Sequence, residues 1–500
     1  MAATPYKQLE QEWQRLHAFS GALSLLRWDA AVMMPRGSAD VRGEQLAAIE
    51  TEHHALLTSP RVSRLLERAQ AGTAGLDEWQ KANLREMARQ RDHAIATPVS
   101  LITRLARATS LAEVRWAEAR EKQDFAIFAP HLEEVLKLVR DRAALLGQAL
   151  GLAPYDALVD GFTPGLRSAE IDTVFRTLSR RLPALIREVI ERQAGQPPLP
   201  LSGRFAPGKQ RALIAEVMKA FGFPFDRGRL DESDHPFTEG VAGDIRITTK
   251  LDGADPFKGL LAALHETGHA LYDLGVPREW RTQPVGKERG IALEESQALL
   301  IEMIVCRSRP FLSWLKPLLE KHFAVSGPAW EPENLYRVLT QVRRSAIRVD
   351  ADELTYPMHV VLRHDIERDL LEGRLAVRDL PDAWNKGMAD RLEVTPANAA
   401  EGCLQDIHWA HGSFGYFPSY AIGAVIAAQL FEGLRVATPD LDAHLARGEF
   451  GIVTRWLAEH VHAEGARLTP PELVKQATGK PLTAASSLRY LESKYLEDPR

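Results

Sequence analysis

The sequence has few cysteines, no long apolar run and no large excess of charge of either sign. Only Cys306 and Cys403 occur in 500 residues, and Cys306 lies within an apolar helical pattern. This argues against a disulfide-stapled secreted fold and favours a reducing compartment. The formal net charge of −5 gives no electrostatic reason to expect nucleic acid or an anionic membrane as a partner.

Targeting and membrane signals are also scarce. The longest membrane-like run, residues 421–431, is too short to span a bilayer. Residues 1–16 are polar and charged and lack the apolar centre of a signal peptide. We therefore expect a soluble, cytoplasmic protein.

Helical periodicity dominates what is present. Residues 6–26 are predicted to form a helix, with later breaks near 72–75 and 97–98, and Ala129-Pro130 is predicted to start another long helix. The Pro-rich stretch at 196–200 is the best candidate boundary between two lobes. We expect a mostly α-helical protein with a small sheet. It would form one catalytic unit over 1–500, with an N-terminal helical lobe (1–195) and a lobe carrying the functional site (196–500).

The most informative stretch is His265-Glu266-Thr267-Gly268-His269. Residues four apart lie on one face of a helix, so His265 and His269 can offer two imidazoles to one metal ion. Glu266 lies one step round, placed to take a proton from water on that metal, as in H-E-x-x-H zinc hydrolases. The alternative is a chance spacing on a core helix, which a third ligand would decide.

Residues 290–306 supply candidates for that ligand. The segment is apolar almost all round, so it should be a buried helix, where Glu294 and Glu295 are costly unless a cation or hydrogen-bond donors compensate them. Glu295 aligns with Ile291, Leu299 and Met303, and Glu294 with Ile301 and Val305. Periodicity does not choose between the two glutamates.

A second candidate element precedes the metal helix. Residues 243–249 alternate strictly, which predicts a strand with Asp244, Arg246 and Thr248 on one face and two isoleucines on the other. The charged face is either solvated or directed into a cleft. A strand beside a peptidase cleft can also pair with the backbone of a peptide.

Together these segments resemble the carboxypeptidase Taq family of metallopeptidases. Five motifs carry the resemblance, in chain order: residues 244–248 (D-x-R-x-T), 265–269 (H-E-x-x-H), 295–297 (the end of H-E-S-Q), 347–352 (I-R-x-x-A-D) and 402–409 (G-x-x-Q-D-x-H-W). Further likeness lies at 28–29, 34–35, 235–237 and 414–420. One departure is plain, because Glu294 stands where the family has His.

The resemblance implies a mostly helical fold with a deep groove closed at one end. It implies release of single residues from peptide C-termini, with broad side-chain preference, and commonly a homodimer. It assigns Glu295 as the third ligand of a zinc ion, for which cobalt often substitutes. Glu294 would then add negative charge beside the metal.

The remaining motifs supply candidates for the other roles. An oxyanion donor is expected among His408, Tyr416 and Tyr420, although the aromatic cluster 414–420 also fits core packing. The resemblance favours a functional His408 and leaves the two tyrosines open. A terminal carboxylate needs a planar cationic fork, for which Arg348 and Arg246 are the candidates. Asp350 and Asp352 make a structural ion pair the alternative for Arg348.

Three hypotheses follow from the sequence. A zinc carboxypeptidase is favoured. An oligopeptidase-type endopeptidase would use the same site in an open channel. A peptide-binding scaffold with a vestigial site is weakened because Glu266 is retained.

Overall fold

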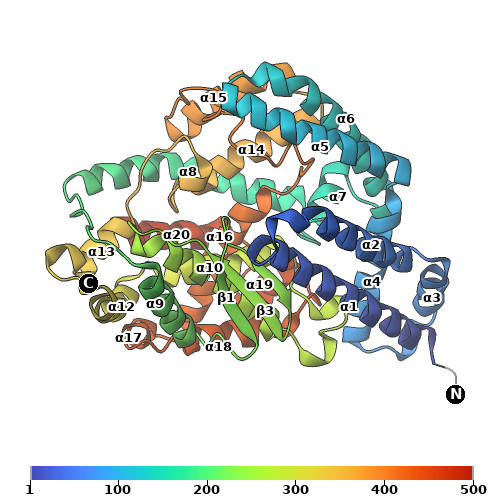
Figure 1. The fold of residues 1–500 in the computed structure, drawn as a ribbon, viewed down its shortest axis with the longest axis horizontal. Coiled ribbons are helices and arrows are strands. Elements are labelled where there is room, and N and C mark those ends of the chain that lie inside the picture. Colours follow the sequence, from blue (N-terminus) through green and yellow to red (C-terminus); the bar gives the residue numbers. More distant parts are fainter. Residues whose placement is uncertain (1–2, 498–500) are drawn as a thin grey trace.

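The computed structural model describes residues 3–497, so 1–2 and 498–500 of the predicted 1–500 unit lie outside the described residues. The chain is mostly helical with one small sheet, as predicted (Figure 1). The α-helices are α1 (Pro5–Val32), α2 (Ala39–Leu57), α3 (Pro60–Gln70), α4 (Glu78–Ala96), α5 (Val99–Lys122), α6 (Phe125–Leu150), α7 (Pro154–Asp160), α8 (Ser168–Ala194), α9 (Pro207–Ala220), α10 (Pro256–Gly275), α11 (Ile291–Leu299), α12 (Arg309–Phe323), α13 (Pro332–Leu339), α14 (Tyr356–Leu371), α15 (Leu380–Leu392), α16 (Pro418–Ala437), α17 (Leu441–Ala446), α18 (Gly451–His460), α19 (Pro470–Thr478) and α20 (Ala484–Leu496). The strands are β1 (Gly228–Glu232), β2 (Thr238–Val241) and β3 (Asp244–Thr249). A π-helical turn, η5 (Leu300–Val305), continues α11.

Most helix boundaries follow local chemistry. The predicted breaks at 72–75 and 97–98 are confirmed, since they fall between α3 and α4 and between α4 and α5. The predicted start at Ala129-Pro130 is wrong. Helix α6 begins at Phe125 because the Asp124 side chain accepts the Ala126 N–H at 2.9 Å, and Pro130 lies inside the helix.

The sheet lies beside the predicted metal helix. Its order is β1-β3-β2, with β3 parallel to β1 and antiparallel to β2. The predicted strand at 243–249 is confirmed as β3, and Ile245 and Ile247 are fully buried. Because β3 is central, both of its edges are occupied and the suggested pairing of this strand with a peptide is wrong. Strands β1 and β2 are the two edge strands of the sheet.

Two hydrophobic clusters organise the interior formed by residues 3–497. The larger takes residues from α5 through α20, on both sides of the suggested boundary at 195/196. The smaller joins α1, the end of α2, α3 and α4, which lie together at one side of the molecule (Figure 1). Residues 196–206 do form the connection between α8 and α9. The division into two lobes stays a prediction.

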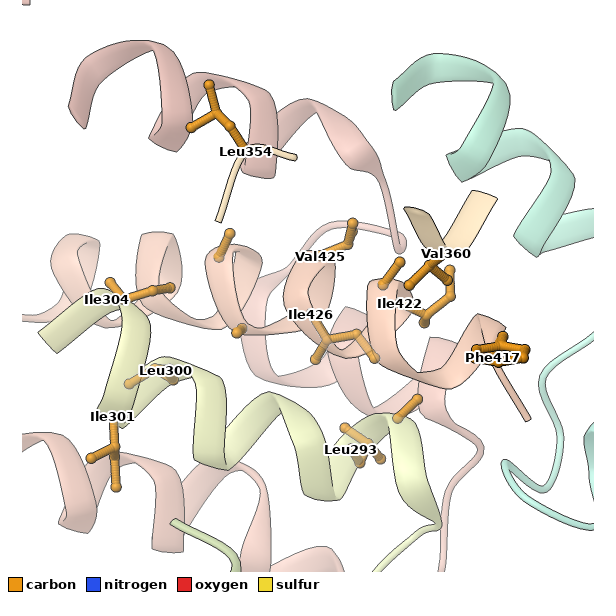
Figure 2. Packing of buried hydrophobic residues seen from close by; sticks show 14 of the residues in the cluster. Leu293, Leu300, Ile301, Ile304, Leu354, Val360, Phe417, Ile422, Val425 and Ile426 are labelled. Carbon is orange, nitrogen blue, oxygen red and sulfur yellow. The ribbon is translucent and has the colours of Figure 1, made fainter. Parts of the chain in front are cut away.

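Helix α16 runs along α11 through the core. Figure 2 shows Leu293 near Ile422 and Ile426 of α16, with Leu300 and Ile304 farther along the same pair of elements. By length and composition α16 is the one helix among residues 3–497 that could cross a membrane, and it is longer than the run expected from sequence. However, 61% of its most apolar window is buried in the protein, which is typical of a core helix.

Candidate active site

The two histidines of α10 and one glutamate of α11 converge. The nearest side-chain atoms of His265, His269 and Glu295 all lie within 4.8 Å of one another. The two Nε2 atoms are 3.3 Å apart, and His265 Nε2 lies 3.9 Å from Glu295 Oε2. Two ligands held at 2.0–2.1 Å from an ion at the tetrahedral angle stand about 3.3–3.4 Å apart. The donor set and its spacing therefore fit a divalent metal ion.

Local sequence explains why the helices meet here. Asp255 caps α10 by accepting the N–H groups of Phe257 and Lys258, and Pro256 occupies the first turn. Gly268, inside the metal motif, lets α11 approach, since a Cβ there would lie 2.5 Å from Ala298 Cα. On the opposite side, a Cβ on Gly423 of α16 would lie 2.7 Å from Glu295 Cβ. Because these two positions are glycines, α10 and α16 can both pack closely against α11, which places Glu295 next to the histidine pair.

A further carboxylate supports His265. Glu302, seven residues after Glu295, lies 3.2 Å from His265 Nδ1 and is paired with Arg307 Nη2 at 2.6 Å. Such a carboxylate orients a ligating imidazole and makes it more basic. Sequence reasoning missed Glu302, although a third glutamate in so apolar a helix was a usable signal.

The electrostatics of the cluster favour a cation. Burial lowers the pKa of His265, but the hydrogen bond with Glu302 and the charge of Glu295 outweigh burial and raise that pKa to about 9. Burial raises the pKa of Glu302, but Arg307 and His265 outweigh it and lower that pKa to about 2. Burial also lowers the pKa of His269 to about 3, so His269 is neutral, whereas a metal ion would have to displace a proton from His265.

Glu266 is buried next to the ligands and held by the sheet. Thr238 of the edge strand β2 donates its hydroxyl to Glu266 Oε2 at 2.8 Å. Burial raises the pKa of Glu266, whereas the charge of His265 and the Thr238 hydrogen bond lower it. A carboxylate with a raised pKa is better suited to hold a proton during a reaction. Thr238 was not identified from sequence, because the Thr-Glu-Gly-Val of β2 is too short to show alternation.

Glu294 points to a different neighbourhood. Burial raises its pKa well above the usual range, and the charges of Glu288 and Asp273 add to that effect before the charge of Glu295 does. Glu294 is not one of the three grouped ligands. The geometry thus separates the two glutamates that helical periodicity left equivalent.

Arg348 belongs to a buried charged group. Its Nε and Nη2 donate to Asp406 at 3.0 and 2.8 Å, and its Nη1 donates to the Tyr356 hydroxyl at 3.2 Å. The ion-pair partner is thus Asp406, not the neighbouring Asp350 or Asp352. Arg363, fully buried, also donates to Asp406 at 2.6 Å. Two arginines share one carboxylate, so the group carries an excess positive charge.

The three candidate oxyanion donors lie together. The ring centroid of His408 is 5.3 Å from that of Tyr416 and 6.4 Å from that of Tyr420, and the two tyrosine rings are 5.2 Å apart. Burial lowers the pKa of His408 to about 4. Burial raises the pKa of both tyrosine hydroxyls, and the charge of Glu295 contributes. Both hydroxyls therefore stay protonated and able to donate.

The candidate residues of β3, Asp244, Arg246 and Thr248, make their contacts away from the metal ligands. Arg246 pairs with Asp244 at 3.1 Å and lies over the ring of Trp28 at 4.2 Å. Thr248 is buried and accepts the Phe237 N–H at 3.0 Å. Within the described chain, no hydrogen bond or ion pair joins these three residues to the metal ligands. The structure therefore places them around the loop at 233–237 and the first helix.

Comparison with known proteins supports this site. Residues 8–495 match the sequence model of the carboxypeptidase Taq (M32) metallopeptidases. The chain is 36% identical to thermostable carboxypeptidase 1 of Thermus thermophilus over 97% of both chains, and 34% identical to that of Pyrococcus furiosus over 98% of both. Its structure matches metallocarboxypeptidase 1 of Trypanosoma cruzi with a TM-score of 0.96 and 38% identity, covering 99% of each chain. The converging histidines and glutamate, the fold and these likenesses together show that the chain belongs to the carboxypeptidase Taq (M32) family of metallocarboxypeptidases.

Proposed function

We propose that this carboxypeptidase releases single C-terminal residues, with broad side-chain preference, using one zinc ion held by His265, His269 and Glu295. The convergence of these three side chains within 4.8 Å, with Glu266 beside them, carries the proposal. When bound, zinc supplies a Lewis acid that polarises the scissile carbonyl and makes water easier to deprotonate. Cobalt is expected to substitute for it.

In this proposal the chain's own residues move the protons. Glu266 takes a proton from the attacking water and later delivers it to the leaving amine. The Thr238 hydroxyl holds one oxygen of Glu266, which leaves the other for the water. His408 and Tyr420, with Tyr416 assisting, donate hydrogen bonds to the oxyanion that develops on the carbonyl.

Arg348 would bind the terminal carboxylate of the peptide. The group of Arg348, Arg363 and Asp406 has one positive charge in excess, and Arg348 is only 7% exposed. An incoming carboxylate would neutralise that charge and fix the last peptide bond over the metal. We propose that three residues of β3 contact the substrate farther from the metal, near Trp28 and the loop at 233–237. They are Asp244, Arg246 and Thr248.

A comparison of a peptide with its C-terminal amide tests the exopeptidase activity. Removing one partner of a buried charge pair costs roughly 2–5 kcal/mol, so the amide should be cleaved roughly 30-fold or more slowly. Arg348→Ala should shrink this ratio, whereas Arg343→Ala, on an exposed side chain, should not. Asp406 keeps Arg363 as a partner in Arg348→Ala, so folding should survive.

Other outcomes would favour the other candidates. Equal cleavage of acid and amide, or internal cleavage first, would support an oligopeptidase. Stoichiometric zinc without any hydrolysis would support a binding scaffold. An unchanged ratio in Arg348→Ala would move the carboxylate site elsewhere, with Arg246 tested next.

We further propose a cytoplasmic homodimer. Both cysteines are buried and free, which suits a reducing compartment. Light scattering should give twice the 55.6 kDa chain mass, and a monomer mass would contradict the dimer.

A further inference from the structure

A cavity of about 380 Å³ lies between the first helices and the loop that precedes α11. Its volume is within the range of about 300–1,000 Å³ typical of ligand sites. Residues of α1, α2, α4 and α6 and of the loop at 282–287 line it, and α1, α2 and α4 lie together at one side of the molecule (Figure 1). The three metal ligands, Glu266 and Arg348 are not part of its lining. The cavity is therefore distinct from the candidate active site.

The ionisable side chains that line this cavity are all basic. No Asp or Glu among residues 3–497 contributes to the lining, whereas six basic residues do: His17, His53, Arg89, His93, Arg142 and Lys287. Two of these six already have acidic partners behind the wall. Arg89 pairs with Glu86 at 2.8 Å, and His93 lies 3.1 Å from Asp160. The unbalanced charge of the cavity therefore comes from Arg142 and Lys287.

Arg142 and Lys287 are partly buried, and neither side chain makes a hydrogen bond or an ion pair within residues 3–497. Burial lowers the pKa of the Arg142 guanidinium, and no neighbouring carboxylate offsets this effect. Burial raises the pKa of Asp273 and Glu294, and the charge of Lys287 opposes this, but neither carboxyl lines the cavity. Partly buried cations without a partner are costly. An anion in the cavity would supply the partner that both cations lack.

The two histidines from the first helices lie within reach of the same charge. Burial lowers the pKa of His17 and of His53, and the charge of Lys287 lowers both further. Both imidazoles are therefore neutral, and each offers one N–H as a donor. His53 also lies 3.4 Å from the Ser20 hydroxyl, which lines the cavity as well. An anion would thus meet neutral polar groups of α1 and α2 opposite the two cations.

The side chains indicate which anion fits. The planar fork of Arg142 can bind two oxygens of one carboxylate or phosphate group, and Lys287 adds a compact second charge. Two positive charges are balanced by a dianion. The remaining wall includes apolar side chains of Trp13, Leu16 and Leu57. These leave room for a short carbon chain between or beside the charged groups.

We propose that this cavity binds a small dianion with carboxylate or phosphate oxygens, held by Arg142 and Lys287. The proposal does not depend on the proposed function. The bound anion connects α1, α2 and α6 with the loop that leads into α11, and it stabilises the folded state because it binds the folded protein alone.

Calorimetric titration of the zinc-loaded enzyme with inorganic phosphate and, separately, with succinate tests this site. The wild type should bind at least one of them, equally well after zinc has been removed, and the anion should raise the midpoint of thermal unfolding. Binding of one anion alone would identify phosphate or carboxylate as the preferred group. Arg142→Gln should weaken binding roughly tenfold or more, because hydrogen bonds to charged groups are strong. Lys137→Gln, which removes a positive charge from an exposed position of the same helix, is the matched control.

Two further measurements separate binding from folding. Without anion, Arg142→Gln should unfold at the same temperature as the wild type or slightly higher, since it removes an unpaired charge and no contact. Lys287→Gln should also weaken binding. Absence of binding to the wild type, undiminished binding in Arg142→Gln, or equal losses in Arg142→Gln and Lys137→Gln would overturn the site. Loss in Arg348→Ala alone would place the anion at the active site and overturn it too. None of these results bears on peptide hydrolysis, so the proposed function would stand.

Discussion

Two clusters of buried polar side chains in this enzyme satisfy their hydrogen-bonding groups differently. In the Glu367 cluster, Tyr155 and the Gly415 N–H donate to one carboxylate oxygen and Trp409 to the other. Both ring nitrogens of His364 lie near Tyr155 or Asp172. In the metal cluster (His265, His269 and Glu295), two Nε2 atoms face each other, and His269 Nδ1 has no hydrogen-bond partner within 3–497.

The difference shows that burial alone does not distinguish a structural cluster of polar residues from a functional one. Both clusters are deeply buried, and both contain a carboxylate whose pKa is raised by burial. In the Glu367 cluster, donors from the protein itself satisfy both carboxylate oxygens, as is required of buried polar groups in a folded core. The metal cluster brings one ligand atom from each of three side chains to a shared point, which is the arrangement that a metal ion requires. Substitutions should therefore affect ligand binding in one cluster and folding in the other.

The largest effect is expected at Glu266. Glu266→Gln keeps the shape and the Thr238 contact but removes the base, so turnover should fall by roughly 10²–10⁴-fold. Zinc content and peptide hydrolysis are measured on the same preparation. Retained zinc with lost turnover is expected, and near-normal hydrolysis would contradict the assigned role.

The two adjacent glutamates of α11 give the next largest effect. Glu295→Ala removes a metal ligand and should weaken zinc binding by at least about 100-fold, above the range seen for supporting residues. Glu294→Ala is the matched control. The Glu294 carboxyl lies near Glu288 and Asp273, so this substitution should leave most of the zinc affinity. Metal titration of both variants decides. Loss confined to Glu294→Ala would reverse the ligand assignment.

Sequence reasoning reached the parts of this site that depend on local spacing. The i and i+4 histidines and the alternation of β3 are local, so the shared helix face of the histidines and the strand were predicted correctly. The choice between Glu294 and Glu295 depends on how Gly268 and Gly423 let three helices approach, which periodicity does not encode. The pairing of Arg348 with Asp406 joins residues 58 apart in sequence, and the motif list alone did not indicate it.

Glu302 provides a smaller and more specific test of the metal cluster. Glu302→Gln keeps a hydrogen-bond acceptor for His265 Nδ1 but removes the negative charge, so zinc affinity should fall about 10–100-fold. Glu333→Gln, which changes an exposed glutamate paired with Arg309, is the control. If both variants bind zinc like the wild type, Glu302 serves only to hold Arg307.

The smallest effect is expected in the Glu367 cluster and is measured as a change in the free energy of unfolding. Burial raises the pKa of Glu367 from 4.5 to about 7, and the hydrogen bonds of Tyr155, Trp409 and Gly415 only partly offset this. The folded state therefore binds the proton more tightly than the unfolded state. Stability from this group is full below pH 4.5 and is lost as pH rises to about 7.

Glu367→Gln removes that titration and keeps a neutral side chain of the same shape. Relative to the wild type, the variant should gain about 2 kcal/mol of unfolding free energy between pH 5 and pH 8, given 1.36 kcal/mol per pKa unit. Urea unfolding of both proteins at the two pH values measures the difference, and zinc content should not change. A difference that is the same at both pH values would show that Glu367 is ionised throughout. The hydrogen bonds of the Glu367 cluster would then be made to a charged carboxylate rather than to a neutral carboxyl. The two clusters would differ only in the geometry of their polar groups.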